Sequence, residues 1–350
     1  MGVLNHMPVS RLTPVFDGHN DLLLRLWLDD GADPVDRFLH QQLDGQLDFA
    51  RMQRGGFAGG LFAVFVPPAS LMPQLKPGAP AQPHDPLAIT RAQIGLLHEI
   101  ESRSAGRAKL CRTAQEILSC IEQGVLALVL HIEGADALDS SLEQLDEFYQ
   151  AGLRSIGPLW NNPNQFGYGV TGAFPGSPDS GDGLTAAGLA LLHACNRKKI
   201  LVDLSHMNEK AFWQVAQHSS APLVATHSNA HALCAQPRNL TDKQLAAIGE
   251  SRGFVGVNFG NAFLRADGKR DADTPLSDII RHLDYLLTKL GEEGVGFGSD
   301  FDGISVPAAL GDVAGLPRLI AVMRAAGYSH ELIEKICWRN WLNVLARSWQ

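Results

Sequence analysis

Short apolar runs recur along the chain, and most of them are followed by a segment whose apolar positions repeat at helical spacing. Runs rich in β-branched residues predict strands, whereas a repeat near 3.6 residues predicts amphipathic helices. The predicted strands cover residues 14–17, 60–66, 126–132, 153–159, 200–205, 222–226, 254–259 and 295–298. The clearest predicted helices cover residues 184–199, 209–218, 242–251 and 276–290. Strand and helix alternate eight times, so we predict an α/β fold of the (β/α)8 barrel type, with extended βα loops over its carboxyl-terminal face.

The composition is compatible with one large domain. The chain has 350 residues, of which 45% are hydrophobic and 19% are charged. A chain of this kind can bury an extensive core, and α/β barrels often have this length. We therefore predict a single domain that spans residues 1–350.

The charge and cysteine content narrow the range of partners. A formal net charge of −8 argues against nucleic acid, because such binding needs clustered Lys and Arg. Small neutral or zwitterionic partners fit better. The five cysteines include no C-x-x-C pair, which is typical of a reducing compartment, and no apolar run approaches the ~18 residues of a membrane span. We expect a cytoplasmic protein with no membrane partner.

Residues of metal-binding type stand where several predicted strands end. They are His19, Asp21, Glu133, His206 and His227. In a parallel barrel the carboxyl ends of the strands meet at one rim, where the βα loops form a pocket. A strand also places residues i and i+2 on one face, so His19 and Asp21 can offer an imidazole and a carboxylate to one cation. The pattern predicts a metal site at this rim, with enough donors for a second ion.

Other features near the predicted site have simpler interpretations. His131 shares a strand face with Glu133, and we interpret it as a residue that fills the barrel interior. The Gly- and Pro-rich stretches 67–86 and 161–183 each follow a predicted strand. They should therefore rise over the pocket, where they either shape the substrate site or connect elements.

Short motifs in a fixed order connect the chain with a known family. They are DGHNDL at 17–22, IEG at 132–134, DLSH at 203–206, THSNA at 226–230, PRNL at 237–240, GFGSDFDG at 296–303 and NWLNVL at 340–345. Each motif is weak alone, but their order and separations resemble those of the membrane dipeptidase family. This family, also called renal dipeptidase or peptidase family M19, belongs to the amidohydrolase-type metal hydrolases. The resemblance covers nearly the whole chain.

The resemblance implies two zinc ions per chain that share one carboxylate, Glu133. The remaining ligands divide between the two ions, with His19 and Asp21 on one and His206 and His227 on the other. Charge counting agrees with two ions independently of the family. Two zinc ions bring four positive charges, of which Asp21, Glu133 and a bridging hydroxide remove three, while neutral histidines remove none. A nearby Asp300 would roughly balance the cluster.

The resemblance also suggests how a peptide bond would be cleaved. Two metals held ~3.5–4 Å apart lower the pKa of a shared water and polarise the scissile carbonyl, which makes the bridging Glu133 part of the catalytic apparatus. We assign proton transfer to Asp300, because the family pattern favours it over Asp302, its neighbour in GSDFDG. Arg238 matches the arginine that in this family holds the terminal carboxylate of the substrate, a contact that suits a planar guanidinium.

One position departs from the family pattern. Better-known members carry a histidine in the loop after the fourth predicted strand, where it contacts the substrate carbonyl, whereas this chain has Trp160 in GPLWNNPN. An indole N–H can donate a hydrogen bond, but the ring does not titrate. Asn161, Asn164 or Tyr168 could supply the replaced contact, and Trp160 itself is a candidate for the wall of the substrate site.

We therefore predict a metal-dependent dipeptidase that uses a metal-bridging hydroxide, with dipeptides that carry a D-residue at the carboxyl side among its substrates. One alternative keeps the metals and changes the bond to another small amide, a lactam or an N-acyl amino acid. A second alternative is a barrel that binds a metal or small ligand without turnover. The expected partner is a small-molecule substrate, and a homodimer is compatible with the sequence.

Overall fold

Parallel strands form the wall of a barrel. The computed structural model describes residues 12–78 and 84–350, and within these ranges one parallel sheet contains nine strands. Eight of them follow one another around the barrel in the order β6-β5-β4-β2-β1-β9-β8-β7. Their bounds are β1 (Val15–Asn20), β2 (Phe57–Phe65), β4 (Leu126–Glu133), β5 (Leu153–Gly157), β6 (Leu201–Val202), β7 (Val224–Ala225), β8 (Phe254–Val257) and β9 (Val295–Phe297).

The barrel closes between β6 and β7. These two short strands are joined through a parallel bridge between Asp203 and Val224, and the Leu204 N–H donates to the Val224 carbonyl at 2.8 Å. The predicted (β/α)8 barrel is therefore confirmed. The prediction of a single domain over residues 1–350 stays a prediction.

Several details of the strand prediction were wrong. β1 continues to Asn20 beyond the predicted 17, β2 begins at Phe57 before the predicted 60, and β8 ends at Val257 before the predicted 259. The ninth strand, β3 (Ala108–Leu110), has too few residues to stand out in the sequence, and it pairs with the first half of β4 beside the barrel order. The strand predicted at 153–159 ends at Gly157, before Pro158, whose nitrogen has no proton to donate. The strands predicted at 200–205 and 222–226 are only two residues long each.

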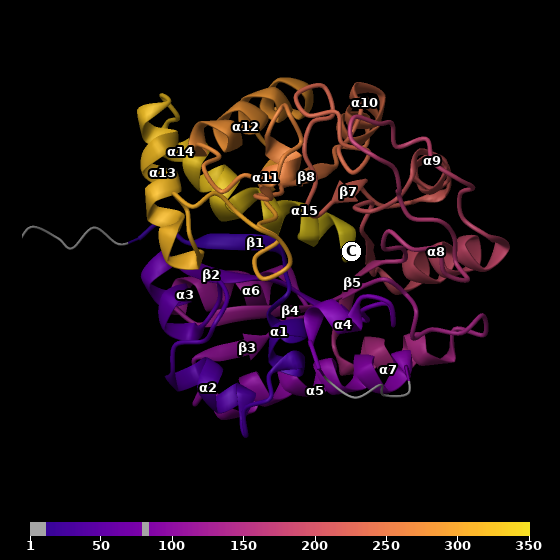
Figure 1. The fold of residues 1–350 in the computed structure, drawn as a ribbon, viewed down its shortest axis with the longest axis horizontal. Coiled ribbons are helices and arrows are strands. Elements are labelled where there is room, and N and C mark those ends of the chain that lie inside the picture. Colours follow the sequence, from indigo (N-terminus) through magenta and orange to yellow (C-terminus); the bar gives the residue numbers. More distant parts are fainter. Residues whose placement is uncertain (1–11, 79–83) are drawn as a thin grey trace, which may run out of the picture.

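Helices surround the strands, as Figure 1 shows, with colours that run along the chain from indigo through magenta and orange to yellow. The helices in the first half of the chain are α1 (Leu22–Leu28), α2 (Pro34–His40), α3 (Phe49–Gly55), α4 (Met72–Leu75), α5 (Pro86–Arg103), α6 (Ala114–Gln123) and α7 (Glu143–Ala151). Those in the second half are α8 (Ala186–Lys198), α9 (Glu209–His218), α10 (Asp242–Glu250), α11 (Asn261–Leu264), α12 (Leu276–Leu290), α13 (Leu316–Ala325), α14 (His330–Glu334) and α15 (Asn340–Ser348). The short segments η1 (Val313–Gly315) and η2 (Lys335–Arg339) precede α13 and α15.

Local sequence explains where several helices begin. The side chains of Asn208 and Thr241 accept hydrogen bonds from backbone N–H groups in the first turns of α9 and α10, and Gln244 completes a capping box in α10. In α12, Ile279, Leu283 and Leu286 recur on one face and are buried. The predicted bounds of α9 and α12 are confirmed, and α8 and α10 differ from their predictions by one or two residues.

The C-terminal helix α15 fills the amino-terminal end of the barrel. Its Trp341 is fully buried, packs against Phe16 of β1 and Phe254 of β8, and donates its indole N–H to the Phe297 carbonyl at 2.8 Å. A Cβ atom at Gly18 would overlap with this indole, so the close approach requires glycine. The apolar packing leaves the opposite end of the barrel for polar side chains.

Two loops that were expected to cover the pocket are described to different extents. Of the stretch 67–86, residues 79–83 lie outside the described part of the chain. The stretch 161–183 packs against the segment after β6, where the Val170 N–H donates to the His206 carbonyl at 2.7 Å. Within residues 12–78 and 84–350, no helix has both the length and the apolar character that crossing a bilayer requires.

Replacing Trp341 with Ala should lower the free energy of unfolding by about 3–5 kcal/mol, because it removes the largest buried side chain at the closed end of the barrel. Chemical denaturation followed by circular dichroism measures this change. Trp213→Ala is the matched control, since Trp213 is 37% exposed and its removal should cost less than about 1 kcal/mol. Equal denaturation midpoints for the two variants would contradict the packing argument.

Candidate metal centre

The predicted metal-binding side chains gather at the carboxyl ends of the strands. His19 is the second-last residue of β1 and Glu133 the last residue of β4, while His206 and His227 follow β6 and β7. Asp21 occupies the N-cap position of α1 rather than a strand position, so the strand-face argument that joined it to His19 was wrong, although the two side chains do meet. Their closest atoms, His19 Nε2 and Asp21 Oδ2, are 3.5 Å apart.

Glu133 lies at the centre of this cluster and is only 6% exposed. Its Oε2 atom faces His19 Nε2 at 3.6 Å. Its Oε1 atom faces His206 Nε2 at 2.9 Å and His227 Nε2 at 3.4 Å. The two oxygens of one carboxylate are thus directed at different donor groups, which is the arrangement needed for a carboxylate that connects two cations.

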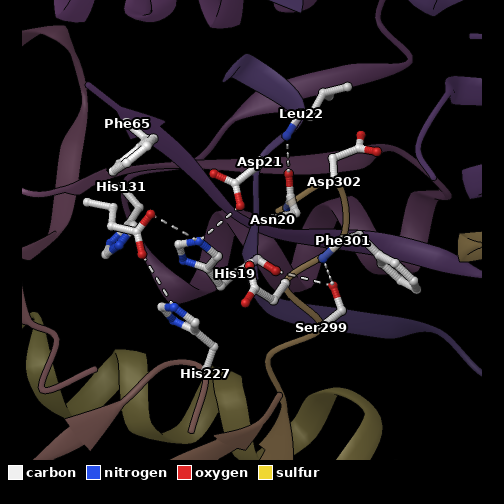
Figure 2. A network of polar contacts seen from close by, with 12 residues as sticks. His19, Asn20, Asp21, Leu22, Phe65, His131, His227, Ser299, Phe301 and Asp302 are labelled. Atoms are coloured by element: carbon white, nitrogen blue, oxygen red, sulfur yellow. Dashed lines mark hydrogen bonds and ion pairs between the residues drawn. The ribbon is translucent and has the colours of Figure 1, made fainter. Parts of the chain in front are cut away.

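The imidazole rings are held close together. The rings of His19 and His227 stack with centroids 3.8 Å apart, and Figure 2 shows the His19 ring between Asp21 and His227. His206 Nε2 and His227 Nε2 are 3.1 Å apart. Both ring nitrogens of His19 are buried and lack a hydrogen-bond partner among the described residues. Buried nitrogens normally have partners, so this ring is a candidate to bind a group other than a protein donor or acceptor.

The electrostatics of the cluster favour added positive charge. Burial raises the pKa of Asp21 and Glu133, and it raises the pKa of Asp300 to about 7. Burial alone would lower the pKa of His19, but the charges of Glu133, Asp21 and Asp300 outweigh it and raise that pKa to about 10. Three carboxylates withdrawn from water are costly unless a cation compensates them.

The donor set fits divalent metal ions. One oxygen or nitrogen from each of His19, Glu133 and His227 lies within 4.8 Å of the others, and the same holds for His19, Asp21 and Asp300. Burial lowers the pKa of His206 and His227 well below the usual histidine value, which keeps both imidazoles neutral and able to donate a lone pair. Neutral imidazole and carboxylate are the usual protein ligands of zinc alongside cysteine.

Asp300 is separated from Asp302 by the geometry of the turn after β9. Both residues adopt left-handed backbone angles, with φ of 61° and 68°, so they do not lie on one face of an extended strand. Asp300 turns to the cluster and accepts a hydrogen bond from Asn258 Nδ2 at 2.8 Å. Asp302 instead accepts from the Gln46 backbone N–H at 2.6 Å and holds the α2–α3 connection.

Arg238 is buried beside the cluster. Its side chain is 8% exposed, and its guanidinium donates to Ser228 Oγ at 2.8 Å and to the His227 carbonyl at 2.9 Å. Burial lowers its pKa from the usual arginine value, and the charges of Asp300, Asp203 and Glu133 partly offset that effect. The Nε atom lacks a hydrogen-bond partner among the described residues, so the guanidinium keeps donor capacity for another group.

Trp160 lies at the edge of the cluster, where its ring centroid is 5.0 Å from that of Phe65 and 6.1 Å from that of His206. Of the residues considered as replacements for the family histidine, Asn161 uses Oδ1 to bind His206 Nδ1 at 2.8 Å. Asn164 binds backbone groups of its own loop. Tyr168 is 39% exposed.

Several contacts that support the cluster were not predicted from the sequence. Asn258 binds Asp300, Asn161 binds His206, and Thr226 binds His227 Nδ1 at 2.8 Å. A signal for two of them exists, because Asn258 and Thr226 are polar residues inside predicted apolar strands. His131, interpreted as filling the interior, is fully buried and contacts Ser155 Oγ at 2.8 Å.

Comparison with known proteins decides the family. The family model described as membrane dipeptidase (peptidase family M19) matches residues 5–348. The chain belongs to this family. The predicted family and the enzyme class, a metal-dependent dipeptidase, are therefore confirmed.

Similar proteins include two metallopeptidases of known structure. One is a dipeptidase AC of family M19 with 50% sequence identity and a TM-score of 0.91, covering 97% of this chain and 99% of that one. The other is a Rhodobacter sphaeroides metallopeptidase with 48% identity and a TM-score of 0.91, covering 97% of this chain and 100% of that one. It was crystallised with a phosphinate mimic of the dipeptide L-Ala-D-Ala. A Klebsiella pneumoniae protein from the pqqA 5′ region is 60% identical over 77% of this chain and 99% of its own length.

Gly303 gives a test of how tightly the carboxylates of this M19 chain are placed. A Cβ atom at this position would overlap with both Asp21 Oδ2 and Asp300 Oδ1. Gly303→Ala should therefore displace both carboxylates and lower kcat for dipeptides by on the order of 10²-fold, the cost of a misplacement of about 1 Å. Steady-state kinetics measures the loss.

Gly95→Ala is the control for this substitution, because Gly95 lies inside α5 with open space around its α-carbon. It should leave kcat unchanged and stabilise the helix slightly. If Gly303→Ala kept the kcat of the Gly95→Ala variant, the close packing of the two carboxylates would have no role in turnover.

Proposed function

We propose that this M19 enzyme hydrolyses dipeptides with two zinc ions that share Glu133. The observation that carries the proposal is the division of the Glu133 oxygens, one directed at His19 and the other at His206 and His227. His19 and Asp21 would hold one ion together with Glu133, and the other two histidines would hold the second. The donor chemistry favours zinc, although other divalent ions use the same ligands.

The bound ions would lower the pKa of a water molecule and polarise the scissile carbonyl. The remaining chemistry belongs to the protein. Asp300 faces the same cluster as Asp21 and His19, and Asn258 holds one of its oxygens. From this position the carboxylate can accept the proton of the attacking water and deliver it to the leaving amine, which must be protonated to depart.

Substrate recognition is assigned to Arg238 and Trp160. The buried guanidinium of Arg238 can bind the terminal carboxylate of a dipeptide, and the carboxylate would compensate a positive charge that is withdrawn from water. Trp160 with Phe65 would form an apolar wall beside His206. The L-Ala-D-Ala mimic bound by the Rhodobacter sphaeroides relative supports dipeptides with a D-residue at the carboxyl side as substrates.

Trp160 also supports a second candidate function, hydrolysis of another small amide, a lactam or an N-acyl amino acid. An indole in place of the family histidine changes how the carbonyl region is contacted. A substrate panel separates the two functions. A dipeptidase will prefer dipeptides with a free amine, whereas a consistent preference for N-acyl amino acids would favour the second function.

The state of the cysteines bears on where the protein works. All five cysteines are buried and unpaired, which supports our proposal of a cytoplasmic location because reducing compartments keep thiols in this state. The homodimer stays a prediction.

Asp300→Asn should lower kcat by ~10²–10⁴-fold while two metal ions remain bound, because the amide cannot accept the proton. Asp302→Asn is the control, since an amide oxygen can still accept the Gln46 N–H, and it should keep kcat within about tenfold of the original enzyme. Kinetics with metal analysis of each variant makes the comparison. If Asp300→Asn keeps full turnover, another group transfers the proton and the role proposed for Asp300 is wrong.

Removing the metals should abolish dipeptide hydrolysis, and zinc should restore it as two equivalents bind. Zinc should also raise the midpoint of thermal unfolding, because an ion that binds only the folded state stabilises it by mass action. Activity and unfolding are both followed during titration of the metal-free protein. Full restoration of activity by one equivalent of zinc would contradict the proposal of two ions. Activity of the metal-free protein would contradict any role of metal in the hydrolysis.

A further inference from the structure

A buried carboxylate, that of Asp203, connects β6 and β7 where the barrel closes. Beyond the two-residue strands β6 and β7, Asp203 Oδ1 accepts hydrogen bonds from the Ser205 N–H at 2.9 Å and from the Thr226 N–H at 2.8 Å. The second oxygen, Oδ2, accepts from the Thr226 hydroxyl at 2.6 Å. Asp203 is 1% exposed. Its side chain thus joins the two chain segments where the ladder between the strands has ended.

The Thr226 hydroxyl extends this contact to His227. Its oxygen lies 2.8 Å from His227 Nδ1. Backbone N–H groups can only donate, so the two that bind Asp203 favour its ionised form, which can only accept. The Thr226 hydroxyl has a single proton to donate. The proton of Thr226 is therefore donated to Asp203, and its oxygen accepts from His227. This direction requires the proton of the neutral imidazole to be on Nδ1.

The consequence appears on the other side of the ring. With the proton on Nδ1, His227 Nε2 carries a lone pair, and this atom faces Glu133 Oε1 at 3.4 Å. A carboxylate that binds the outer nitrogen of a metal-binding histidine, directly or through another group, fixes the ring and raises its basicity. His206 differs in its support, because its Nδ1 faces the neutral amide oxygen of Asn161 at 2.8 Å.

We propose that Asp203 and Thr226 form a positioning relay, which couples closure of the barrel to the Nδ1-protonated form of His227 and so prepares one metal ligand before any ion binds. This inference rests on the proposed function, since it assigns His227 to a metal. Neither Asp203 nor Thr226 contacts the reacting atoms. Both act through His227.

Thr226→Val tests the relay, because valine keeps the shape of threonine and removes its hydroxyl. Zinc affinity is measured by competition with a chromophoric chelator on metal-free protein. We expect one of the two zinc ions to bind about 10–100-fold more weakly in Thr226→Val, the usual cost of losing an outer-shell partner. Thr226→Ser keeps the hydroxyl and should bind both ions within a few-fold of the original protein.

Nitrogen NMR of histidine-labelled, metal-free protein provides a readout that a merely structural role would not change. The His227 signals, assigned by their loss in His227→Gln, should show a protonated Nδ1 in the original protein and in Thr226→Ser. In Asp203→Asn the amide can donate to the Thr226 hydroxyl and reverse the direction of its hydrogen bond. This variant should shift His227 to the Nε2-protonated form, even if Thr226→Val does not fold.

The outcomes separate this inference from the proposed function. The relay is overturned if Thr226→Val binds both zinc ions as tightly as the original protein, or if His227 of the metal-free original protein is protonated on Nε2. The proposed function fails instead if the original protein binds no zinc, whatever the form of His227.

Discussion

Glu133 places a carboxylate among three imidazoles at a position that solvent barely reaches, with one oxygen toward His19 and the other toward His206 and His227. Every other feature of the rim can be described by its relation to this group. In β4, Glu133 lies on the same face of the strand as the buried residues Ala127 and Val129. The alternation of side chains along the strand therefore places its carboxylate at the rim of the barrel. The closed, apolar end around Trp341 gives the strands the rigidity that such placement needs.

The cluster would be unfavourable without compensation. Burial, together with the neighbouring carboxylates, raises the pKa of Asp300 to about 7, and the negative charges around His19 raise its pKa to about 10. The fold holds these groups together through contacts outside the cluster: Asn258 on Asp300, Asn161 on His206 and the Asp203–Thr226 pair on His227. The unfavourable free energy of bringing these carboxylates together is therefore part of the folding free energy. A cation then binds side chains that are already in position.

Sequence patterns predicted the features that depend on residues close together in the chain, such as helix bounds and strand ends. The helical periodicity of α9 and α12 predicted their bounds, and strand ends predicted the residues that converge at the rim. The supporting contacts could not be predicted in this way, because Asn161 reaches His206 from a loop whose path has no periodicity. The turn after β9 was missed for a related reason, since left-handed angles at Asp300 and Asp302 are unusual outside glycine. β6 and β7 are shorter than predicted where the Asp203 side chain accepts the Thr226 N–H.

A crystal structure of the zinc-loaded enzyme, with anomalous difference maps recorded at the zinc absorption edge, tests the central claim most directly. The account predicts two zinc peaks, one on each side of the Glu133 carboxylate, with His19 and Asp21 next to one and His206 and His227 next to the other. A single peak, or two peaks with Glu133 turned away from both, would contradict it.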